Sequence, residues 1–415
     1  RVDRRQRQMC IRDRLYFNKP IMLKQFRIFL LLSLLLCFPS MVHGQEQRDS
    51  IRFSLMTCAP GQEIYSLFGH TAIRYENYTR GVDVVFNYGL FSFNTPNFVM
   101  RFVKGETDYQ LGVIPYEYFE AEYAMRGSDV YQQVLNLTER ENQKLLYLLE
   151  ENYKPQNRVY RYNYFYDNCT SRARDRIEQA IDGNVVYPDS FPGRTFRSIV
   201  HEYTRNSDWD ELGIDLCLGA AADRTIGKRL QMFAPFYMRS YAQRAFIVDS
   251  KGVKRPLVST EFKAIEAEEA SSEPGFVLSP MICSLLFFAI CLFLVYWQYI
   301  HGSVYWWLDI ILCVAQGVAG CIIAFLFFFS VHPTVGSNWM IILFNPLPLL
   351  CLPWIVFAGM KHKHTSIYWF FVVYLTLFIC IIPVCGQKIN LSVLPLALGL
   401  LVNYAGHILV CRKRK

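Results

Sequence analysis

Two residues in the first half of the chain have the side chains that nucleophilic acyl chemistry needs. Cys169 stands in the stretch DNCT (167–170), directly before apolar residues at helical spacing, and His70 begins an alternating stretch typical of a strand. A cysteine attacks as a thiolate, and the free N–H groups and dipole of a helix N-terminus lower its pKa. A histidine held on a strand can take the thiol proton. We therefore predict Cys169 as the nucleophile and His70 as the general base.

Each of these residues also has a plainer interpretation. Most lone cysteines are buried and inert, and most lone histidines are solvated or satisfied within a core. The joint pattern favours catalysis, since a Gly-His at a strand start precedes an Asn-Cys at a helix start in the sequence. If Cys169 is the nucleophile, the N–H groups of the same first helical turn are expected to hold the oxyanion of a tetrahedral intermediate.

A β-hairpin is expected to position His70. Residues 70–75 and 83–88 both alternate between apolar and polar, and a polar turn with Asn77 and Gly81 joins them. With the turn centred near residues 78–79, the residue opposite His70 is Asn87 or Tyr88. Asn87 is the candidate that would orient the imidazole, whereas Asp83 lies too near the turn.

The remaining pattern of the first half predicts an α+β domain. We expect strands at 51–56, 108–114 and 130–137, a short helix at 64–68, and a helix from 139 to 152 with Thr138 as its N-cap. A further amphipathic helix is expected at 171–181, ended by Gly183. Cys169 would then lie at or near a helix N-terminus.

The second half has the composition of a membrane domain. Of the 415 residues 52% are hydrophobic, and charged residues become rare between Phe276 and Val410. Apolar runs of nearly twenty residues predict about five transmembrane helices, near 277–299, 305–329, 339–358, 367–385 and 391–410. Five crossings place the basic tail 412–415 in the cytoplasm if the large domain is exported, as the positive-inside rule requires.

The N-terminal residues indicate export. The stretch MCIRDR (9–14) is what a common sequencing-adapter end gives when translated, so residues 1–21 are expected to be non-native. A basic segment and an apolar stretch then predict a signal peptide at 22–44. We place an exported catalytic domain at 45–273, with a charged linker at 263–272, and a transmembrane domain at 274–411.

Cysteine spacing and charge limit the other classes of site. Cys58, Cys169 and Cys217 are the only cysteines of the exported domain, so at least one is unpaired within it, and a bridge between Cys58 and Cys217 is one possibility. No Cys/His cluster has zinc spacing, so we expect no metal and no cofactor. The net charge of +8 comes largely from the two ends, and nothing suggests a nucleic-acid partner.

Three polar residues of the membrane half are secondary candidates. Asp309 within the second span is costly to place in lipid, so it is either functional or close enough to the helix end to reach the interface. His332 and Asn338 lie in an outer loop on the side of the exported domain. They would bind lipid head groups, close the site, or simply form a loop.

The order of histidine before cysteine resembles the circularly permuted papain-like enzymes, which are NlpC/P60-related and include lecithin:retinol acyltransferase. A closer resemblance covers nearly the whole mature chain. The stretches CAPG (58–61), FGHTAIR (68–74), NYG (87–89) with Phe91, YRYNY (160–164) and DNCT (167–170), together with the C-terminal spans, are similar to the Bacteroides-type lipoprotein N-acyltransferase family. This resemblance implies a permuted papain-like periplasmic domain followed by a transmembrane helical bundle in the bacterial inner membrane.

The resemblance also implies an activity. The family moves a fatty acyl chain from a phospholipid to the α-amine of diacylated lipoproteins, and here the chain would pass through a Cys169 thioester with His70 as base. Two other functions remain open at this point. One is a membrane-anchored papain-like cysteine hydrolase of the envelope, a peptidase, amidase or lipase that uses water as acceptor. The other is a membrane sensor or binding protein without enzymatic activity.

Overall fold

The computed structural model describes residues 50–61, 63, 66–267, 278–361 and 366–413. The predicted non-native stretch at 1–21 and the predicted signal peptide at 22–44 lie outside the described residues. The end of the charged linker (268–272) and the last two residues of the basic tail lie outside them as well. Of the short helix expected at 64–68, only residues 66–68 are described, and they form a turn.

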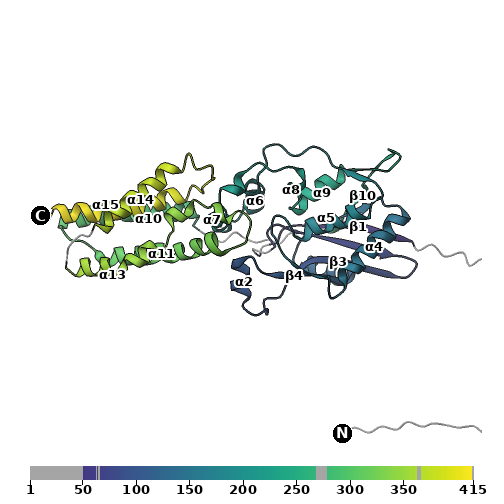
Figure 1. Ribbon diagram of the computed structural model, residues 1–415, viewed down its shortest axis with the longest axis horizontal. Helices are drawn as coiled ribbons and strands as arrows, with labels where there is room; N and C mark the ends of the chain where they lie inside the picture. The colour runs from purple at the N-terminus through teal and green to yellow at the C-terminus, as the bar shows by residue number, and fades with distance from the viewer. Residues whose placement is uncertain (1–49, 62, 64–65, 268–277, 362–365, 414–415) are drawn as a thin grey trace, which may run out of the picture. The chain divides into compact units, whose positions relative to one another are not determined.

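A seven-stranded antiparallel sheet forms the frame of the first half (Figure 1). Its order is β10-β5-β1-β2-β3-β4-β6, and each neighbouring pair is antiparallel. The strands expected near 51–56, 70–75, 83–88, 108–114 and 130–137 are confirmed. The bounds are β1 Ile51–Cys58, β2 His70–Asn77, β3 Val82–Leu90, β4 Asp108–Pro115, β5 Val130–Leu135, β6 Val159–Arg161 and β10 Val258–Ile265, and a smaller sheet joins β7 Asn184–Val186, β8 Phe246–Val248 and β9 Lys254–Pro256.

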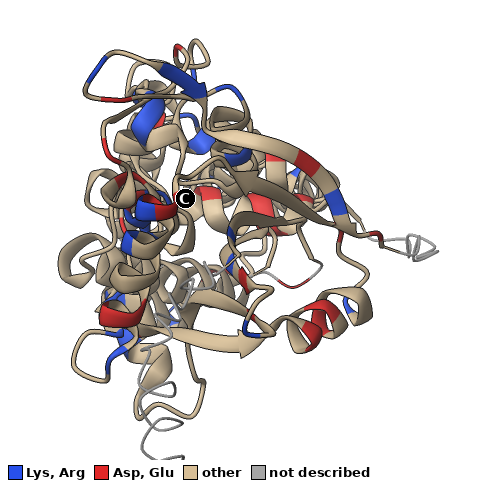
Figure 2. Cartoon of the chain, turned by 90° about the vertical axis from the view of Figure 1, so that its right-hand side faces the viewer, with Lys and Arg blue, Asp and Glu red and all other residues tan. Residues whose placement is uncertain are grey.

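Helices cover this sheet and bury its apolar face. The helix α5 packs against β2, β3 and α4, and its Ala173 and Ile177 are buried in the main core. Thr138 caps α4 through a capping box with Glu141, as expected. On the face shown in Figure 2, basic and acidic residues are interspersed rather than gathered by sign. The bounds are α2 Phe98–Lys104, α3 Tyr116–Met125, α4 Glu139–Tyr153, α5 Cys169–Ala180, α6 Phe196–Thr204, α7 Asp208–Cys217, η1 Ala220–Asp223, α8 Lys228–Gln231 and α9 Pro235–Gln243.

The register of the β2–β3 hairpin differs from the expected one. Asn77 pairs with Val82 and Ile73 with Phe86, which centres the turn one residue later than expected. Extending this register places Gly89, rather than Asn87 or Tyr88, opposite His70. Asn87 is then a diagonal neighbour on the same face of the sheet, where a side chain still reaches across.

The second half is helical, and within its described residues four helical segments are long and apolar enough to cross a membrane. They are Pro280–His301 (α10), Trp306–Phe329 (α11), Met340–Met360, which comprises α12 Met340–Leu343 and α13 Leu347–Met360, and Val393–Lys413 (α15). The fifth expected span, 367–385, forms the shorter helix α14 at Ile367–Ile381. At 1.5 Å per residue α14 is about 22 Å long, less than the roughly 30 Å of a hydrocarbon core. Pro383 limits the helix here, because a proline has no N–H with which to continue the i→i−4 hydrogen bonds.

Asp309 lies inside this bundle and does not reach its surface. Its carboxylate accepts hydrogen bonds from Tyr368 Oη at 3.0 Å and Asn403 Nδ2 at 2.6 Å, and it lies 2.6 Å from His407 Nδ1. Asp309 is in the first turn of α11, and its carboxylate is satisfied by partners inside the bundle rather than by solvent. A buried carboxylate needs such partners, and these connect α11, α14 and α15.

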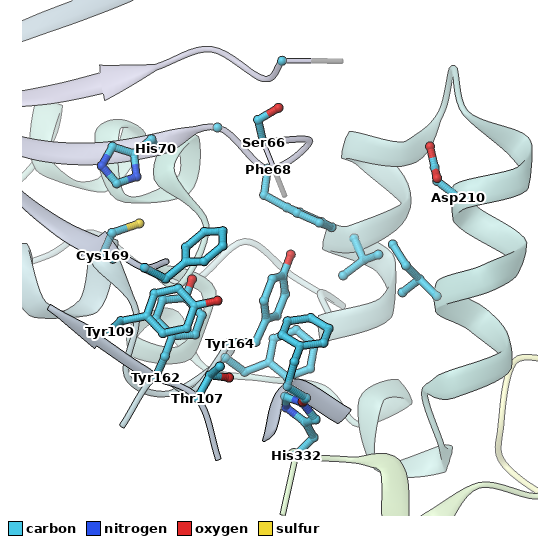
Figure 3. Close-up of a pocket in the computed structure, with 18 of the residues that line it drawn as sticks. Ser66, Phe68, His70, Thr107, Tyr109, Tyr162, Tyr164, Cys169, Asp210 and His332 are labelled. Carbon is cyan, nitrogen blue, oxygen red and sulfur yellow. The ribbon is translucent and has the colours of Figure 1, made fainter. Parts of the chain in front are cut away.

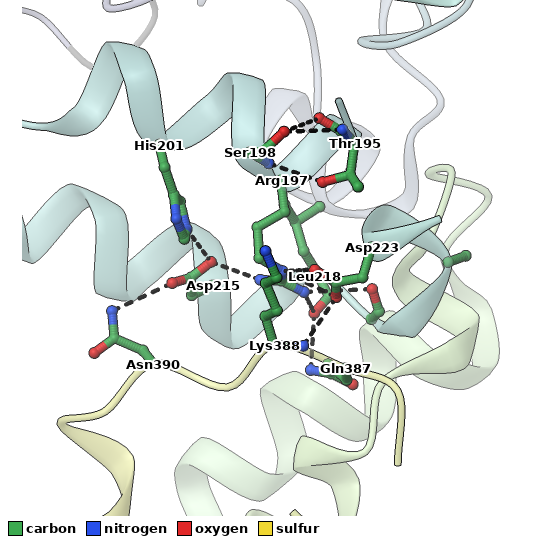
Figure 4. Close-up of polar contacts among 12 residues, drawn as sticks. Thr195, Arg197, Ser198, His201, Asp215, Leu218, Asp223, Gln387, Lys388 and Asn390 are labelled. Atoms are coloured by element: carbon green, nitrogen blue, oxygen red, sulfur yellow. Dashed lines mark hydrogen bonds and ion pairs between the residues drawn. The ribbon is translucent and has the colours of Figure 1, made fainter. Parts of the chain in front are cut away.

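Buried polar groups hold the exported half to the loops of the membrane half (Figure 4). Arg197 on α6 is fully buried and forms ion pairs with Asp215 and Asp223. The same carboxylates accept hydrogen bonds from Asn390 Nδ2 at 3.2 Å and from the Lys388 N–H at 3.1 Å, in the loop between α14 and α15. We call Arg197, Asp215 and Asp223 the Arg197 cluster. This cluster joins α6, α7 and η1 to the loop between α14 and α15.

Asn338 belongs to the same junction. Its Nδ2 donates to Leu216 O at 2.7 Å, and its Oδ1 accepts from Gln387 Nε2 at 3.0 Å. Gln387 Nε2 also donates to Leu218 O. Asn338 thus ties the loop after α11 to the end of α7, which is a structural role.

Candidate active site

Cys169 is the first residue of α5, and Asn168 is the cap that fixes it. The Oδ1 atom of Asn168 accepts from the N–H groups of Thr170 at 3.0 Å and Ser171 at 2.9 Å, and Ser171 Oγ accepts from the Asn168 N–H. The Nδ2 atom of Asn168 donates to the carbonyl oxygens of Tyr164 and Phe233, both at 2.9 Å. All the polar atoms of the Asn168 side chain are therefore used to hold the helix start, which is what an N-cap residue does. The helix begins at Cys169, two residues before the expected start at 171.

This cap changes the expected oxyanion site. Two of the first-turn N–H groups, those of Thr170 and Ser171, already donate to Asn168. The expectation that several first-turn N–H groups receive an oxyanion is wrong for these two. The N–H of Arg172 donates to the backbone oxygen of Asn168. Of the N–H groups of residues 169–172, only that of Cys169 is therefore not bonded to Asn168.

His70 and Asn87 form the second part of the site. The His70 Nε2 atom lies 2.5 Å from Asn87 Oδ1. An amide oxygen only accepts, so Nε2 carries the hydrogen and Nδ1 is the nitrogen left for Cys169. The imidazole lies beside the Cys169 thiol, close enough for each group to shift the pKa of the other, and Figure 3 shows one ring nitrogen on the side of the sulfur. The three predicted site residues are thus brought together.

The electrostatics of this pair favour a thiolate beside an imidazolium. Burial alone would raise the pKa of Cys169, but the positive charge and hydrogen bond of His70 and the Thr71 N–H lower it below its ordinary value. Burial alone would lower the pKa of His70, but the Cys169 thiolate and the Asn87 hydrogen bond raise it above its ordinary value. Each group therefore stabilises the charged form of the other.

Gly89 allows the backbone of β3 to pass close to both groups. A Cβ atom at this position would lie 3.7 Å from Cys169 Cβ and 4.0 Å from His70 Cε1, and φ is +88°. The pairing of β3 with β4 is irregular between Asn87 and Leu90, at the same place. This irregularity, with its left-handed glycine, directs Asn87 toward the imidazole.

A cavity of about 760 Å³ opens from Cys169 and His70. Aromatic side chains of the sheet domain line it, including Phe68, Tyr109, Tyr162 and Tyr164 (Figure 3). Ile322 and Leu326 of α11 line the same cavity, and so do His332 and Val335 from the loop that follows. The cavity therefore joins the thiol to the side of a membrane-spanning helix.

Sequence reasoning missed these walls. The YRYNY stretch contributed only to the resemblance, although Tyr109 and Tyr162 stack at 4.1 Å between ring centres within the cavity. The Tyr164 hydroxyl is buried without a hydrogen-bond partner. His332 lines the cavity, and its Nε2 lies 2.7 Å from Phe102 O.

The cysteines of the sheet domain are free. Cys58 is buried beside Tyr123, whereas Cys217 lines the cavity. The possible Cys58–Cys217 bridge is therefore wrong. Burial raises the pKa of both thiols, in contrast to Cys169.

One group of side chains has ligand atoms close enough for a metal. His201, Glu211 and Asp215 lie within 4.8 Å of one another by these atoms. Arg197 already supplies the positive charge beside Asp215, and Thr204 Oγ1 donates to Glu211. The ligand atoms of His201, Glu211 and Asp215 therefore already have partners, and Arg197 places a positive charge beside them, so this group does not favour a metal ion.

Two family models match the chain. One, described as the Lnb N-terminal periplasmic domain, matches residues 38–202, and the other, described as the Lnb transmembrane domain, matches residues 271–415. Neither a curated protein nor a solved structure matches. The permuted papain-like fold therefore stays a prediction. The first match contains His70, Asn87 and Cys169, and the second contains the bundle residues that line the cavity.

Proposed function

Because the chain belongs to the Lnb family, we propose that it transfers a fatty acyl chain from a phospholipid, through a Cys169 thioester, to the α-amine of a diacylglyceryl-cysteine lipoprotein. The family places a periplasmic domain before a transmembrane domain, so the protein is anchored in the bacterial inner membrane with its large domain in the periplasm. Phospholipids and diacylated lipoproteins are both present at that membrane surface. The proposed partners are therefore available where the site lies.

The observation that carries this proposal is the cavity shared by the two domains. Its walls include Cys169 and His70 at one end and Ile322 and Leu326 of a membrane span at the other. Aromatic and aliphatic walls suit an acyl chain, which gains about 0.8 kcal/mol for each buried methylene. A soluble peptide substrate would not need a binding cavity that is partly lined by a membrane helix, whereas a lipid substrate would.

In the proposed first step Cys169 takes the acyl chain. The thiolate attacks the ester carbonyl carbon, so that a C–S bond forms and the ester C–O bond breaks. The Cys169 N–H is placed to donate to the oxyanion of the intermediate. The His70 imidazolium gives its Nδ1 proton to the departing lysophospholipid oxygen, and Asn87 keeps Nε2 protonated throughout.

In the proposed second step the lipoprotein amine takes the chain. The neutral amine attacks the thioester carbonyl, a C–N bond forms and the C–S bond breaks. Nδ1 of the now neutral His70 accepts the amine proton, and Cys169 leaves as a thiolate. The imidazolium–thiolate pair is thereby restored.

The alternatives differ in the acceptor or in the absence of chemistry. A cysteine hydrolase would pass the acyl group to water, and a sensor would leave Cys169 unreacted. The test is to incubate the full chain, reconstituted in vesicles, with labelled phospholipid and a synthetic diacylated lipopeptide. N-acylated lipopeptide is the expected product. Free fatty acid or a cleaved peptide as the only product, or no turnover, would overturn the proposal.

A further inference from the structure

A short segment between β3 and β4 exposes large apolar side chains. Within residues 91–104, Phe93 is 65% exposed, Val99 74% and Met100 53%. The helix of this segment, α2, has seven residues and buries none of them. A helix this short is marginal in water without a packed face. Some apolar surroundings are therefore needed to hold it.

Aromatic contacts within the segment do not supply a core. Phe91, Phe93 and Phe98 contact one another with ring centres 4.9 to 5.7 Å apart, and Phe98 stacks on Phe102. These rings form one small cluster whose outer side stays open. Phe102 itself is 49% exposed.

The end of a membrane span fixes the position of α2. Ser330 Oγ donates to Val103 O at 2.8 Å, and the Val331 N–H donates to Lys104 O at 2.8 Å. Ser330 directly follows α11, which ends at Phe329. Because a span ends where the bilayer's polar interface begins, α2 lies at the depth of the periplasmic interface.

Exposed apolar side chains occur on both sides of this junction. Phe328 and Phe329 at the end of α11 are 68% and 67% exposed, on a helix that spans the bilayer. Gly105 allows the close approach, since a Cβ there would lie 3.0 Å from the His332 nitrogen and its φ is +77°. The exposed side chains of α2 therefore lie next to the end of a helix that is long and apolar enough to cross a membrane.

The charge of the segment is consistent with that location. Residues 90–105 contain no Asp or Glu, whereas Arg101 and Lys104 are basic. Carboxylates would be repelled by lipid phosphates, while aromatic and basic side chains are enriched at membrane interfaces.

We propose that residues 91–104 insert into the periplasmic leaflet of the membrane and that α2 borders the entrance to the Cys169 cavity. Phe102 and Val103 of α2 line that cavity, so a lipid beside α2 has a direct path to the thiol. The membrane insertion of residues 91–104 is argued from the contacts of α2 with the end of α11 and from its exposed apolar side chains. Only its role as the entrance for an acyl chain rests on the proposed function.

Photocrosslinking tests the insertion without any assay of activity. The full chain, reconstituted in phosphatidylethanolamine–phosphatidylglycerol vesicles, carries p-benzoylphenylalanine at position 99 or 100. Position 328 on α11 is the membrane control, and position 147 is the aqueous control, because Tyr147 is 61% exposed on α4. Lipid adducts at 99 and 100 comparable to those at 328 are expected, with none at 147. Adducts at 328 but not at 99 or 100 would overturn the insertion.

A charged variant tests the entrance. In a Val99→Glu, Met100→Glu double variant, acylation of Cys169 by vesicle phospholipid should fall at least tenfold. Its reaction with water-soluble p-nitrophenyl butyrate should remain unchanged, which also shows that the site is folded. An unchanged rate of Cys169 acylation by vesicle phospholipid would contradict the proposal that α2 borders the lipid entrance. If the wild type itself takes no acyl chain from phospholipid, the proposed function fails, and the crosslinks still decide the insertion.

Discussion

The Nε2 atom of His70 lies 2.5 Å from the Oδ1 atom of Asn87, across two adjacent strands. This contact sets which nitrogen of the imidazole faces Cys169, because the amide oxygen must receive the Nε2 hydrogen. It also helps to raise the pKa of His70. A neutral amide thus contacts the imidazole without adding a negative charge beside Cys169.

Asn87→Ala should slow acyl transfer while leaving substrate binding nearly unchanged. Losing one hydrogen bond to a charged group costs about 1.5–3 kcal/mol, or roughly 10- to 100-fold in rate. The measurement is kcat and KM with phospholipid and lipopeptide, with Asn184→Ala as an exposed control in the smaller sheet. An unchanged kcat would show that Asn87 does not position His70.

Alkylation of cavity thiols should separate Cys169 from Cys217. Because the pKa of Cys169 is lowered, its thiolate is present from below the ordinary thiol pKa upward, so labelling by iodoacetamide should begin at lower pH. Burial raises the pKa of Cys217, so its labelling should begin at higher pH. Peptide mass spectrometry follows both thiols in one sample.

His70→Gln is the matched variant for this titration. Without the imidazolium the burial of Cys169 is uncompensated, so its labelling onset should move to higher pH while that of Cys217 stays. A Cys169 onset that does not move in the variant would contradict the thiolate–imidazolium pair.

Gly89→Ala should lower both stability and activity. At φ +88° an alanine is strained by about 1–2 kcal/mol, although the space for its methyl group exists. Relief of this strain would shift β3 beside Asn87 and so slow acyl transfer. Gly81→Ala is the control, since its φ is +62° in the hairpin turn and nothing lies within 4 Å of the added Cβ. A similar loss of melting temperature with normal activity is expected for the control, and equal activity in both variants would contradict this role of Gly89.

Arg197→Met should weaken the junction between the two halves. It leaves the buried carboxylates of Asp215 and Asp223 without their cation, which typically costs about 3–5 kcal/mol. Arg229→Met removes a comparable number of ion pairs from a side chain that is 56% exposed, and should cost about 1 kcal/mol or less. Thermal unfolding in detergent compares the two variants. Equal losses would mean that the Arg197 cluster does not hold the halves together.

Much of the catalytic arrangement was predictable because it depends on local sequence. Asn168 has the side chain of an N-cap, so the helix start at Cys169 follows from short-range hydrogen bonds. The alternation of 70–75 and 83–88 predicts the hairpin, but the irregularity at Gly89 is set by β4 and not by the turn. The predicted register was wrong because the hairpin turn is centred one residue later than expected, and Asn87 nevertheless contacts His70.

The features that sequence reasoning missed depend on contacts between distant segments. Ile322 lines the cavity because α11 packs beside the sheet domain, and this packing cannot be predicted from the sequence around Ile322. Asp309 has partners on α14 and α15, which hydropathy cannot reveal. We expected the N–H groups of the first turn of α5 to bind the oxyanion without considering the N-cap. Two of these groups, those of Thr170 and Ser171, donate to Asn168 instead.

The measurement closest to the central claim is the mass of the peptide that contains Cys169, after the full chain is incubated with phospholipid vesicles and no acceptor. We predict a mass increase of one fatty acyl group on Cys169, removed by neutral hydroxylamine and lost when the diacylated lipopeptide is added. A Cys169→Ala protein that still makes N-acylated lipopeptide at the wild-type rate would contradict the account.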